Sequence, residues 1–275
     1  MRVLDSHLHL WDPAVLEYAW LSDDLRARFD TPELAAAVDD APPAAARAFV
    51  FVQAECAHAQ ALAEVDWVLA RAEAAGIVGI VARAAVERGE DVVGELEALR
   101  TRPRVVGVRR VLQDEAPGFA TSPAVRDGLR AVAAAGLVFD ACVRAGGLRE
   151  VIALADAVPE LPLILDHLGK PPGARADPKW TEDLRELARR PHVIAKVSGL
   201  PAEARPQWTA DDVRAALDVA RDAFGPERLM FGSDWPVSVP YSRWLRAVLA
   251  WTADWSGAER DDLLWGNAAR AYGMA

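Results

Sequence analysis

The chain is poor in cysteine and contains no long apolar run. Only two cysteines, Cys56 and Cys142, occur in 275 residues, which excludes a small fold held together by a disulfide framework. The first apolar stretch is interrupted at Asp5, so the sequence predicts no secretory signal peptide. No run approaches the roughly 18 apolar residues that a membrane-spanning helix needs. We therefore expect a soluble, cytoplasmic protein without a membrane partner.

The chain also lacks an excess of positive charge. Its 31 basic and 41 acidic side chains give a net charge of −10, which argues against a nucleic-acid partner or an anionic membrane surface. A small anionic substrate stays compatible, because one local arginine can outweigh the global field. No GxGxxG follows the first apolar run and no Walker motif occurs, so nothing supports nucleotide binding. The expected partner is a small molecule, and the sequence does not specify an oligomeric state.

What the chain does contain is a regular alternation of two patterns. Near-continuous apolar runs, typical of parallel strands buried on both faces, alternate with alanine-rich stretches whose apolar residues recur every three or four positions. The runs predict eight strands, at Val3–Leu8, Ala48–Gln53, Ile77–Ala82, Val105–Val111, Val138–Val143, Pro162–Asp166, Val193–Val197 and Leu229–Gly232. The periodic stretches predict helices at Ala59–Ala75, Asp91–Arg100, Pro123–Ala135, Gly147–Ala157, Lys179–Arg190, Ala210–Phe224 and Ser242–Thr252.

This order predicts an α/β protein with the architecture of a (β/α)8 TIM barrel, in one domain over residues 1–275. A doubly wound open sheet is the alternative architecture. Gly76 and Gly136 precede strands, where glycine commonly ends a helix. The segment from Trp255 onward is expected to form a terminal helix that packs back on the barrel.

The first connection is long and rich in aromatic residues. It contains Trp11, Tyr18 and Trp20, followed by a helical pattern over residues 31–39. In a barrel this segment leaves the face that carries the active site. Its aromatic side chains either line a pocket or pack against the rim, and the sequence leaves both interpretations open.

The N-terminal segment Asp5-Ser6-His7-Leu8-His9 carries the strongest chemical signal. Alternate residues of a strand point to the same face, so Asp5, His7 and His9 share one side. Two imidazoles on one face form half of a metal site or of a proton-transfer site.

Other polar residues follow the remaining strands, at the barrel end that usually builds the active site. They are Gln53, Glu55, Arg109, Arg110, Asp140, Cys142, Arg144, Asp166, His167, Lys170, Lys196, Ser198, Ser233, Asp234 and Trp235.

Four of these residues form the predicted centre. His7, His9, His167 and Asp234 together suit Zn²⁺ or Mn²⁺. Asp234 would take a proton from water as general base and return it as general acid. Without a metal, the imidazoles and Arg109 would polarise a carbonyl instead. Arg109 either contacts substrate or forms an ion pair between strands, and Lys196 could simply neutralise a neighbouring carboxylate.

In this order the motifs resemble those of a known family. Asp5-Ser6-His7-Leu8-His9, Asp166-His167-Leu168-Gly169-Lys170-Pro171, Lys196-Val197-Ser198-Gly199-Leu200 and Gly232-Ser233-Asp234-Trp235-Pro236 are similar to the amidohydrolase superfamily, and within it to the branch of L-fuconolactonases and 2-pyrone-4,6-dicarboxylate lactonases. The resemblance implies a distorted (β/α)8 barrel, like that of metal-dependent hydrolases, that opens a lactone ring. It implies His7, His9 and His167 as site histidines, Asp234 as acid and base, and Arg109 as a substrate contact.

The chain departs from the two-metal members of that superfamily. The fifth strand offers Asp140 and Cys142, and the seventh offers Lys196, where those members place further metal ligands. One divalent metal, Zn or Mn, or none is therefore expected.

Two substrate classes remain. A dicarboxylate pyrone would need several cations, which Arg109, Arg110, Arg144 and Lys196 could supply. A sugar lactone of the L-fucono-, L-rhamnono- or galactono- type would need mixed donors and an aromatic platform, which Gln53, Trp20, Trp235 and Glu203 could supply. We predict the sugar lactone, with Gln53, Lys196, Trp20, Trp235 and Asp140 as substrate contacts. A metal-dependent decarboxylase of the same superfamily and a barrel without catalytic activity are the other hypotheses.

Overall fold

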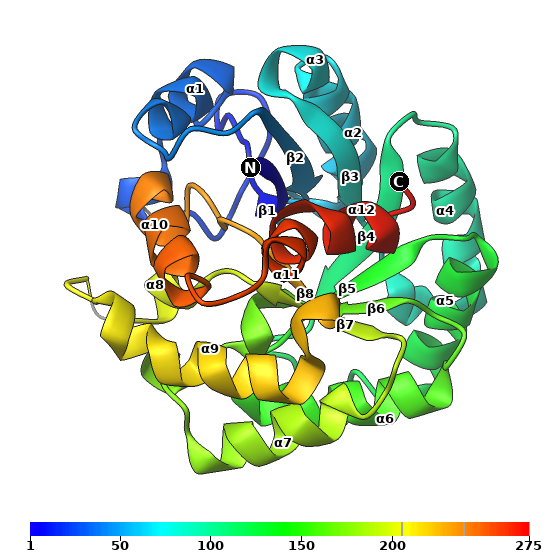
Figure 1. Cartoon of the computed structure of the whole chain (residues 1–275). Coiled ribbons are helices and arrows are strands. Elements are labelled where there is room, and N and C mark those ends of the chain that lie inside the picture. The colour runs from blue at the N-terminus through cyan, green and yellow to red at the C-terminus, as the bar shows by residue number, and fades with distance from the viewer. Residues whose placement is uncertain (205, 239, 275) are drawn as a thin grey trace.

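A computed structural model describes residues 1–204, 206–238 and 240–274. Eight parallel strands stand side by side in chain order and curl into a barrel surrounded by helices (Figure 1). The strands are β1 (Arg2–Leu8), β2 (Ala46–Val52), β3 (Ile77–Arg83), β4 (Val105–Val111), β5 (Val138–Cys142), β6 (Leu163–Leu165), β7 (Val193–Val197) and β8 (Leu229–Phe231). This confirms the predicted (β/α)8 barrel and rules out the open sheet.

The barrel closes between its first and last strands just beyond the strands themselves. Leu8 pairs with Trp235 in an isolated parallel bridge. The His9 amide donates to the Trp235 carbonyl at 2.8 Å, and the Asp234 amide donates to the His7 carbonyl at 2.7 Å. These bonds distort the barrel at its carboxyl end and bring the two histidines of the N-terminus against Asp234.

The helices agree with the predicted ranges with one correction. They are α1 (Thr31–Asp39), α2 (Ala61–Leu69), α3 (Ala72–Ala75), α4 (Val93–Arg100), α5 (Pro123–Ala134), α6 (Leu148–Ala157), α7 (Pro178–Ala188), α8 (Leu200–Glu203), α9 (Ala210–Phe224), α10 (Tyr241–Trp251), α11 (Gly257–Asp261) and α12 (Asn267–Ala271). The single helix predicted over Ala59–Ala75 is two helices, because α2 ends at Leu69 and a new helix starts at Ala72. Gly76 ends α3 with a φ of +71°, a conformation that glycine adopts without steric cost.

The C-terminal segment covers the end of the barrel where β1 begins (Figure 1). A π-helical turn over Asp262–Gly266 joins α11 to α12. The side-chain amide of Asn267 donates from Nδ2 to the Leu229 carbonyl at 2.6 Å, which connects α12 to β8. Tyr272 reaches into the barrel, where its hydroxyl donates to Asp140 at 3.1 Å. Since this end is filled by protein, the strands' carboxyl ends are the side where a ligand can enter.

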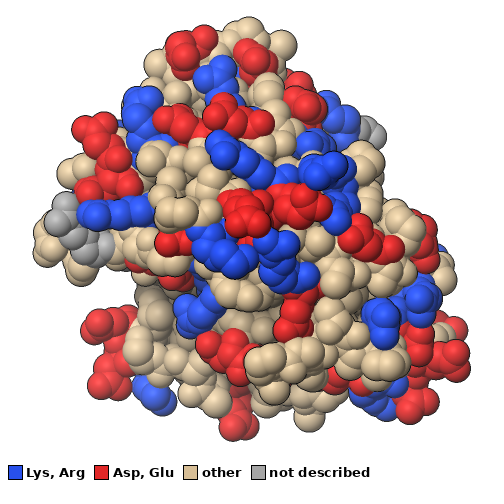
Figure 2. Space-filling model, turned by 90° about the horizontal axis from the view of Figure 1, so that it is seen from below, with Lys and Arg blue, Asp and Glu red and all other residues tan. Residues whose placement is uncertain are grey.

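The surface mixes charges of both signs. Figure 2 shows lysine and arginine side chains lying next to acidic ones on the face drawn. Pairs of this kind include Arg149 with Glu182 at 2.8 Å and Arg190 with Asp156 at 2.8 Å. Exposed pairs contribute little to stability, so the surface gives local charge balance rather than rigidity. Within the described residues, no helix has the length and apolar character needed to cross a membrane.

Candidate active site

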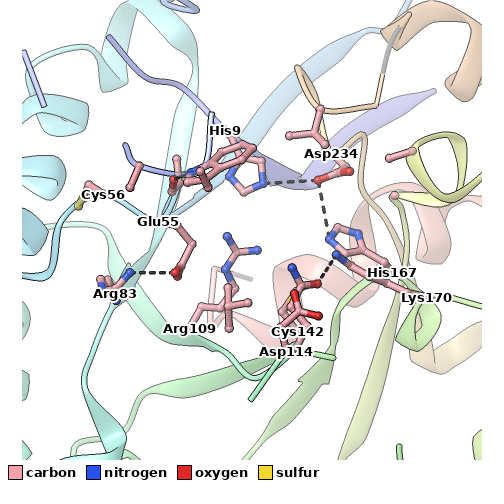
Figure 3. Close-up of a pocket in the computed structure, with 18 of the residues that line it drawn as sticks. His9, Glu55, Cys56, Arg83, Arg109, Asp114, Cys142, His167, Lys170 and Asp234 are labelled. Atoms are coloured by element: carbon pink, nitrogen blue, oxygen red, sulfur yellow. Dashed lines mark hydrogen bonds and ion pairs between the residues drawn. The ribbon is translucent and has the colours of Figure 1, made fainter. Parts of the chain in front are cut away.

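A cavity of about 500 Å³ opens at the carboxyl ends of the strands (Figure 3). Its wall mixes imidazole, carboxylate, guanidinium, ammonium, thiol and indole groups. They include His9, Trp20, Glu55, Cys56, His58, Arg83, Arg109, Gln113, Cys142, His167, Lys170, Glu203 and Asp234. This position is the one that parallel barrels use for catalysis.

Three imidazoles converge on one carboxylate oxygen at the bottom of this cavity. The Nε2 atoms of His9, His7 and His167 lie 3.4, 3.7 and 3.7 Å from Oδ1 of Asp234. The Nε2 atoms of His7 and His9 are 3.2 Å apart. The predicted group His7, His9, His167 and Asp234 therefore comes together in space from β1, from the turn after β6 and from the segment after β8.

The outer nitrogen of each imidazole has its own partner. Nδ1 of His9 lies 2.7 Å from the Val52 carbonyl oxygen, so it must carry the proton and donate it. Nδ1 of His7 lies 3.1 Å from Nζ of Lys196 and 3.2 Å from Oδ1 of Asp166. Nδ1 of His167 lies 2.9 Å from the Ser198 hydroxyl. These contacts orient the rings so that the three Nε2 atoms face the same point, as outer partners do for metal-binding histidines.

The turn after β6 bends His167 back into the site. His167 and Leu168 both adopt a φ of +54°, and Asp234 has a φ of +59°. Such conformations are uncommon for residues with side chains and concentrate at functional sites. Gly199 explains how the ring fits, because a Cβ there would lie 2.3 Å from Nδ1 of His167. The Ser198-Gly199 pair thus supplies a hydrogen bond and the space for the imidazole.

Burial and charge set the protonation states of the group. Burial lowers the pKa of His167 to about 4 and holds the pKa values of His7 and His9 below their usual range. Burial alone would raise the pKa of Asp234, but the surrounding imidazoles keep that pKa well below its usual range. At neutral pH the site therefore holds three neutral imidazoles and one carboxylate, the states in which these groups bind cations.

Ligand atoms of His7, His9 and Asp234 all lie within 4.8 Å of one another, a spacing that fits a single divalent cation. Zinc–nitrogen distances of about 2.0–2.1 Å place two ligands of a tetrahedral ion about 3.3 Å apart. His7 and His9 meet this value with their 3.2 Å separation, and Asp234 lies within 3.4 to 3.7 Å of the imidazole nitrogens. Two neutral imidazoles and a carboxylate are also donors that zinc accepts, and His167 forms a second such group with His7 and Asp166.

Arg109 lies beside this group, at the centre of the cavity (Figure 3). Its Nη1 is 3.3 Å from Nε2 of His7 and 3.3 Å from Oδ2 of Asp166. Its Nη2 donates to the Gln53 carbonyl. The ion pair with Asp166 is present, and Arg109 also lines the cavity, so contact with a substrate stays a prediction.

The comparisons with known proteins agree with this geometry. The amidohydrolase family model matches residues 4–274. The chain belongs to the amidohydrolase family. An L-fucono-1,5-lactonase of Burkholderia multivorans is 34% identical, over 98% of this chain and 96% of that relative. An L-fucono-1,5-lactonase of Burkholderia ambifaria is 30% identical, over 86% of this chain and 80% of that relative.

A solved structure extends the likeness to three dimensions. A zinc-bound amidohydrolase of Burkholderia multivorans superposes with a TM-score of 0.87 and 33% identity, covering 100% of both chains. The family resemblance drawn from the motifs is confirmed, and with it the prediction of a hydrolase.

Four predicted substrate contacts of this amidohydrolase do not reach the cavity wall. Gln53, Asp140 and Lys196 have no exposed surface, and Trp235 is packed against Phe29 with ring centroids 5.5 Å apart. Asp140 and Lys196 lie within β5 and β7, Gln53 and Trp235 follow β2 and β8, and none of the four lines the cavity. Trp20 alone among the five predicted contacts lies on the wall. In the first connection, Trp11 and Tyr18 are buried and pack against the rim of the barrel. Trp20 instead lines the cavity.

Sequence reasoning assigned no role to several wall residues. The strand-end pattern gives no chemical role to Arg83, Gln113 or Cys56, and it marks Glu55 only as a residue after the second strand. Arg83 is the last residue of β3, one position beyond the predicted strand end. Functional residues of a barrel lie at the carboxyl ends of its strands, and Arg83 occupies that position on the third strand.

A buried carboxyl group supports the loop between Ala54 and Ala57 on this wall. Glu64 of α2 has no exposed surface and its Oε1 accepts from the Ala54 amide at 3.1 Å. Burial raises the pKa of Glu64 to about 7. Because the folded protein keeps this proton to a higher pH than the unfolded chain, Glu64 lowers the stability of the fold as the pH rises from about 4.5 to 7.

Replacing Glu64 by glutamine should remove this pH dependence. The glutamine amide keeps an acceptor for the Ala54 amide and never ionises. The free energy of unfolding of the variant, relative to the wild type, should therefore rise by up to about 3 kcal/mol between pH 5 and pH 8. Urea unfolding at both pH values measures the difference. An equal stability difference at the two pH values would show that Glu64 does not carry a raised pKa.

Proposed function

We propose that this amidohydrolase is a lactonase that opens the ring of a polyhydroxylated sugar lactone of the L-fucono-, L-rhamnono- or galactono- type. The convergence of three imidazoles and Asp234 at the floor of a cavity is the observation that carries the proposal. The two relatives named as L-fucono-1,5-lactonases support the same reaction class.

The reaction needs a water, a base and a polarised carbonyl. The Asp234 carboxylate takes a proton as the water oxygen bonds to the lactone carbonyl carbon. The Arg109 guanidinium stabilises the negative charge that develops on the carbonyl oxygen. The bond between the carbonyl carbon and the ring oxygen then breaks, and Asp234 returns its proton to that oxygen. The product is an open-chain hydroxy acid.

We propose His7, His9, His167 and Asp234 as the ligands of one divalent cation, zinc or manganese. The chemistry that such a cation supplies when bound is Lewis acidity toward a carbonyl oxygen and toward water. Outer contacts such as His9 to Val52 then serve to hold the ligand rings in place.

The charges on the cavity wall favour a neutral substrate over a dicarboxylate pyrone. Each cation there already faces a carboxylate. Arg109 lies 3.3 Å from Asp166, Arg83 lies 2.9 Å from Glu55, and Lys170 lies 3.9 Å from Glu203. A dianion would have to compete with these pairs. A polyol finds both donors and acceptors in them.

A panel of lactones assayed with a pH indicator tests the proposal. Sugar lactones should release acid, and 2-pyrone-4,6-dicarboxylate should not. Dialysis against a chelator should abolish acid release, and added zinc or manganese should restore it. Absence of acid release from every lactone, with CO₂ released from aromatic carboxylates, would replace the lactonase by a decarboxylase.

A further inference from the structure

We propose that Glu55 determines the specificity of the cavity by accepting hydrogen bonds from ring hydroxyl groups of the substrate, with Gln53 and Arg83 as its positioning residues. The inference rests on the proposed lactonase function and adds to it the group that distinguishes a hydroxylated lactone from a bare one. It concerns the side of the cavity away from the reacting centre.

Glu55 occupies the position that such a role requires. In the close-up view, its side chain lies on the other side of Arg109 from Asp234 and His167 (Figure 3). A lactone whose carbonyl is held near Asp234 would direct the far part of its ring toward Glu55. The Glu55 side chain is 27% exposed and lines the cavity, so its carboxylate faces the cavity rather than the core.

The side chain is held rigidly from two directions. Gln53 donates from Nε2 to Oε1 of Glu55 at 2.6 Å, and its own Oε1 accepts from the Glu55 amide at 2.6 Å. Arg83 donates from Nη1 to Oε2 of Glu55 at 2.9 Å. This double contact explains why Gln53 is fully buried, because it acts on Glu55 and not on the ligand.

The backbone at this position is also constrained. Glu55 has a φ of +56°, which is uncommon for a residue with a side chain. The conformation directs the residue after β2 into the cavity, where Gln53 fixes it.

The carboxylate still has capacity for a ligand. An ionised carboxyl group offers about four acceptor positions, and the two contacts from Gln53 and Arg83 use two of them. Hydrogen bonds from hydroxyl groups to a charged acceptor are among the stronger ones in proteins. A lactone without hydroxyl groups would leave these remaining acceptor positions unused, so the site favours the hydroxylated ring.

The test compares Glu55→Gln with the wild type on two six-membered lactones, L-fucono-1,5-lactone and the unsubstituted δ-valerolactone. The glutamine removes the charge and places an amide donor against either Gln53 or Arg83. We expect kcat/KM for the sugar lactone to fall roughly 10- to 100-fold, mainly through KM, with a change of less than about threefold for δ-valerolactone.

A second measurement avoids turnover. A non-hydrolysable cyclic ether with the same hydroxyl pattern is titrated calorimetrically into the wild type and into Glu55→Gln, and its Kd should rise by a similar factor. Glu73→Gln, at an exposed position of α3, is the matched control and should leave both substrates unaffected.

The outcomes separate this inference from the proposed function. Equal losses on both lactones, or an unchanged Kd for the cyclic ether, would overturn the role of Glu55 while leaving the lactonase intact. If the wild type hydrolyses no sugar lactone of the panel, the lactonase proposal falls, while the cyclic-ether titration still tests the binding role of Glu55.

Discussion

Replacing Asp234 by asparagine is expected to lower kcat/KM by about a thousandfold while the barrel stays folded. Asparagine cannot accept the proton of the attacking water, and a positioned general base contributes about 10²- to 10⁴-fold. It also removes the negative charge that faces three imidazole nitrogens within 3.7 Å. The bound metal, measured by mass spectrometry of the purified protein, should fall as well.

The fold should tolerate this change because asparagine has the same shape. Oδ2 of Asp234 accepts from the Ser238 hydroxyl at 2.8 Å, and that hydroxyl can accept from an amide instead. Asp24→Asn, at an exposed position before α1, is the matched control and should retain full activity. Wild-type activity in the Asp234 variant would refute both the base and the proposed mechanism.

Replacing Lys196 by methionine is expected to lower the free energy of unfolding by about 3–5 kcal/mol, because it leaves the buried Asp140 carboxylate without its cation. Lys196 has no exposed surface and donates to Asp140. Its Nζ also lies 3.0 Å from Oδ1 of Asp166. The methionine has a similar length but offers neither charge nor donor. Urea unfolding at pH 8 measures the loss.

The loss should depend on pH in a definite direction. Burial raises the pKa of Asp140 to about 6 even with Lys196 present, and removal of that ammonium would raise the Asp140 pKa further. A carboxyl group with a raised folded-state pKa costs stability increasingly as the pH rises. The deficit of the variant should therefore be largest at pH 8 and shrink toward pH 5, where Asp140 is protonated.

Two further variants make this prediction decisive. Adding Asp140→Asn to the Lys196 variant should recover part of the lost stability, since one unpaired charge disappears. Lys179→Met removes a lysine whose side chain is 64% exposed and should change stability by less than about 1 kcal/mol. A Lys196 variant as stable as the wild type at pH 8 would contradict the buried ion network.

The order of apolar runs was enough to predict the barrel. Parallel strands covered on both faces are mostly apolar, and this pattern can be recognised without knowledge of distant contacts. Strand spacing likewise predicted that His7 and His9 share one face, because the side chains of a strand alternate. The carboxyl-end rule then selected His167 and Asp234 from far along the chain.

The direction of each side chain at the barrel mouth was decided only by the tertiary structure. Asp140 and Lys196 lie near the carboxyl ends of β5 and β7, and Asp166 follows β6, yet all three are buried and pair with one another. The placement of His9, His167 and Asp234 instead involves the closure between β1 and β8 and the left-handed backbone at His167 and Asp234. Local propensity does not encode these features, because they arise when eight strands meet. The sequence alone therefore determined the architecture and the types of reactive groups, and packing determined which groups face the substrate.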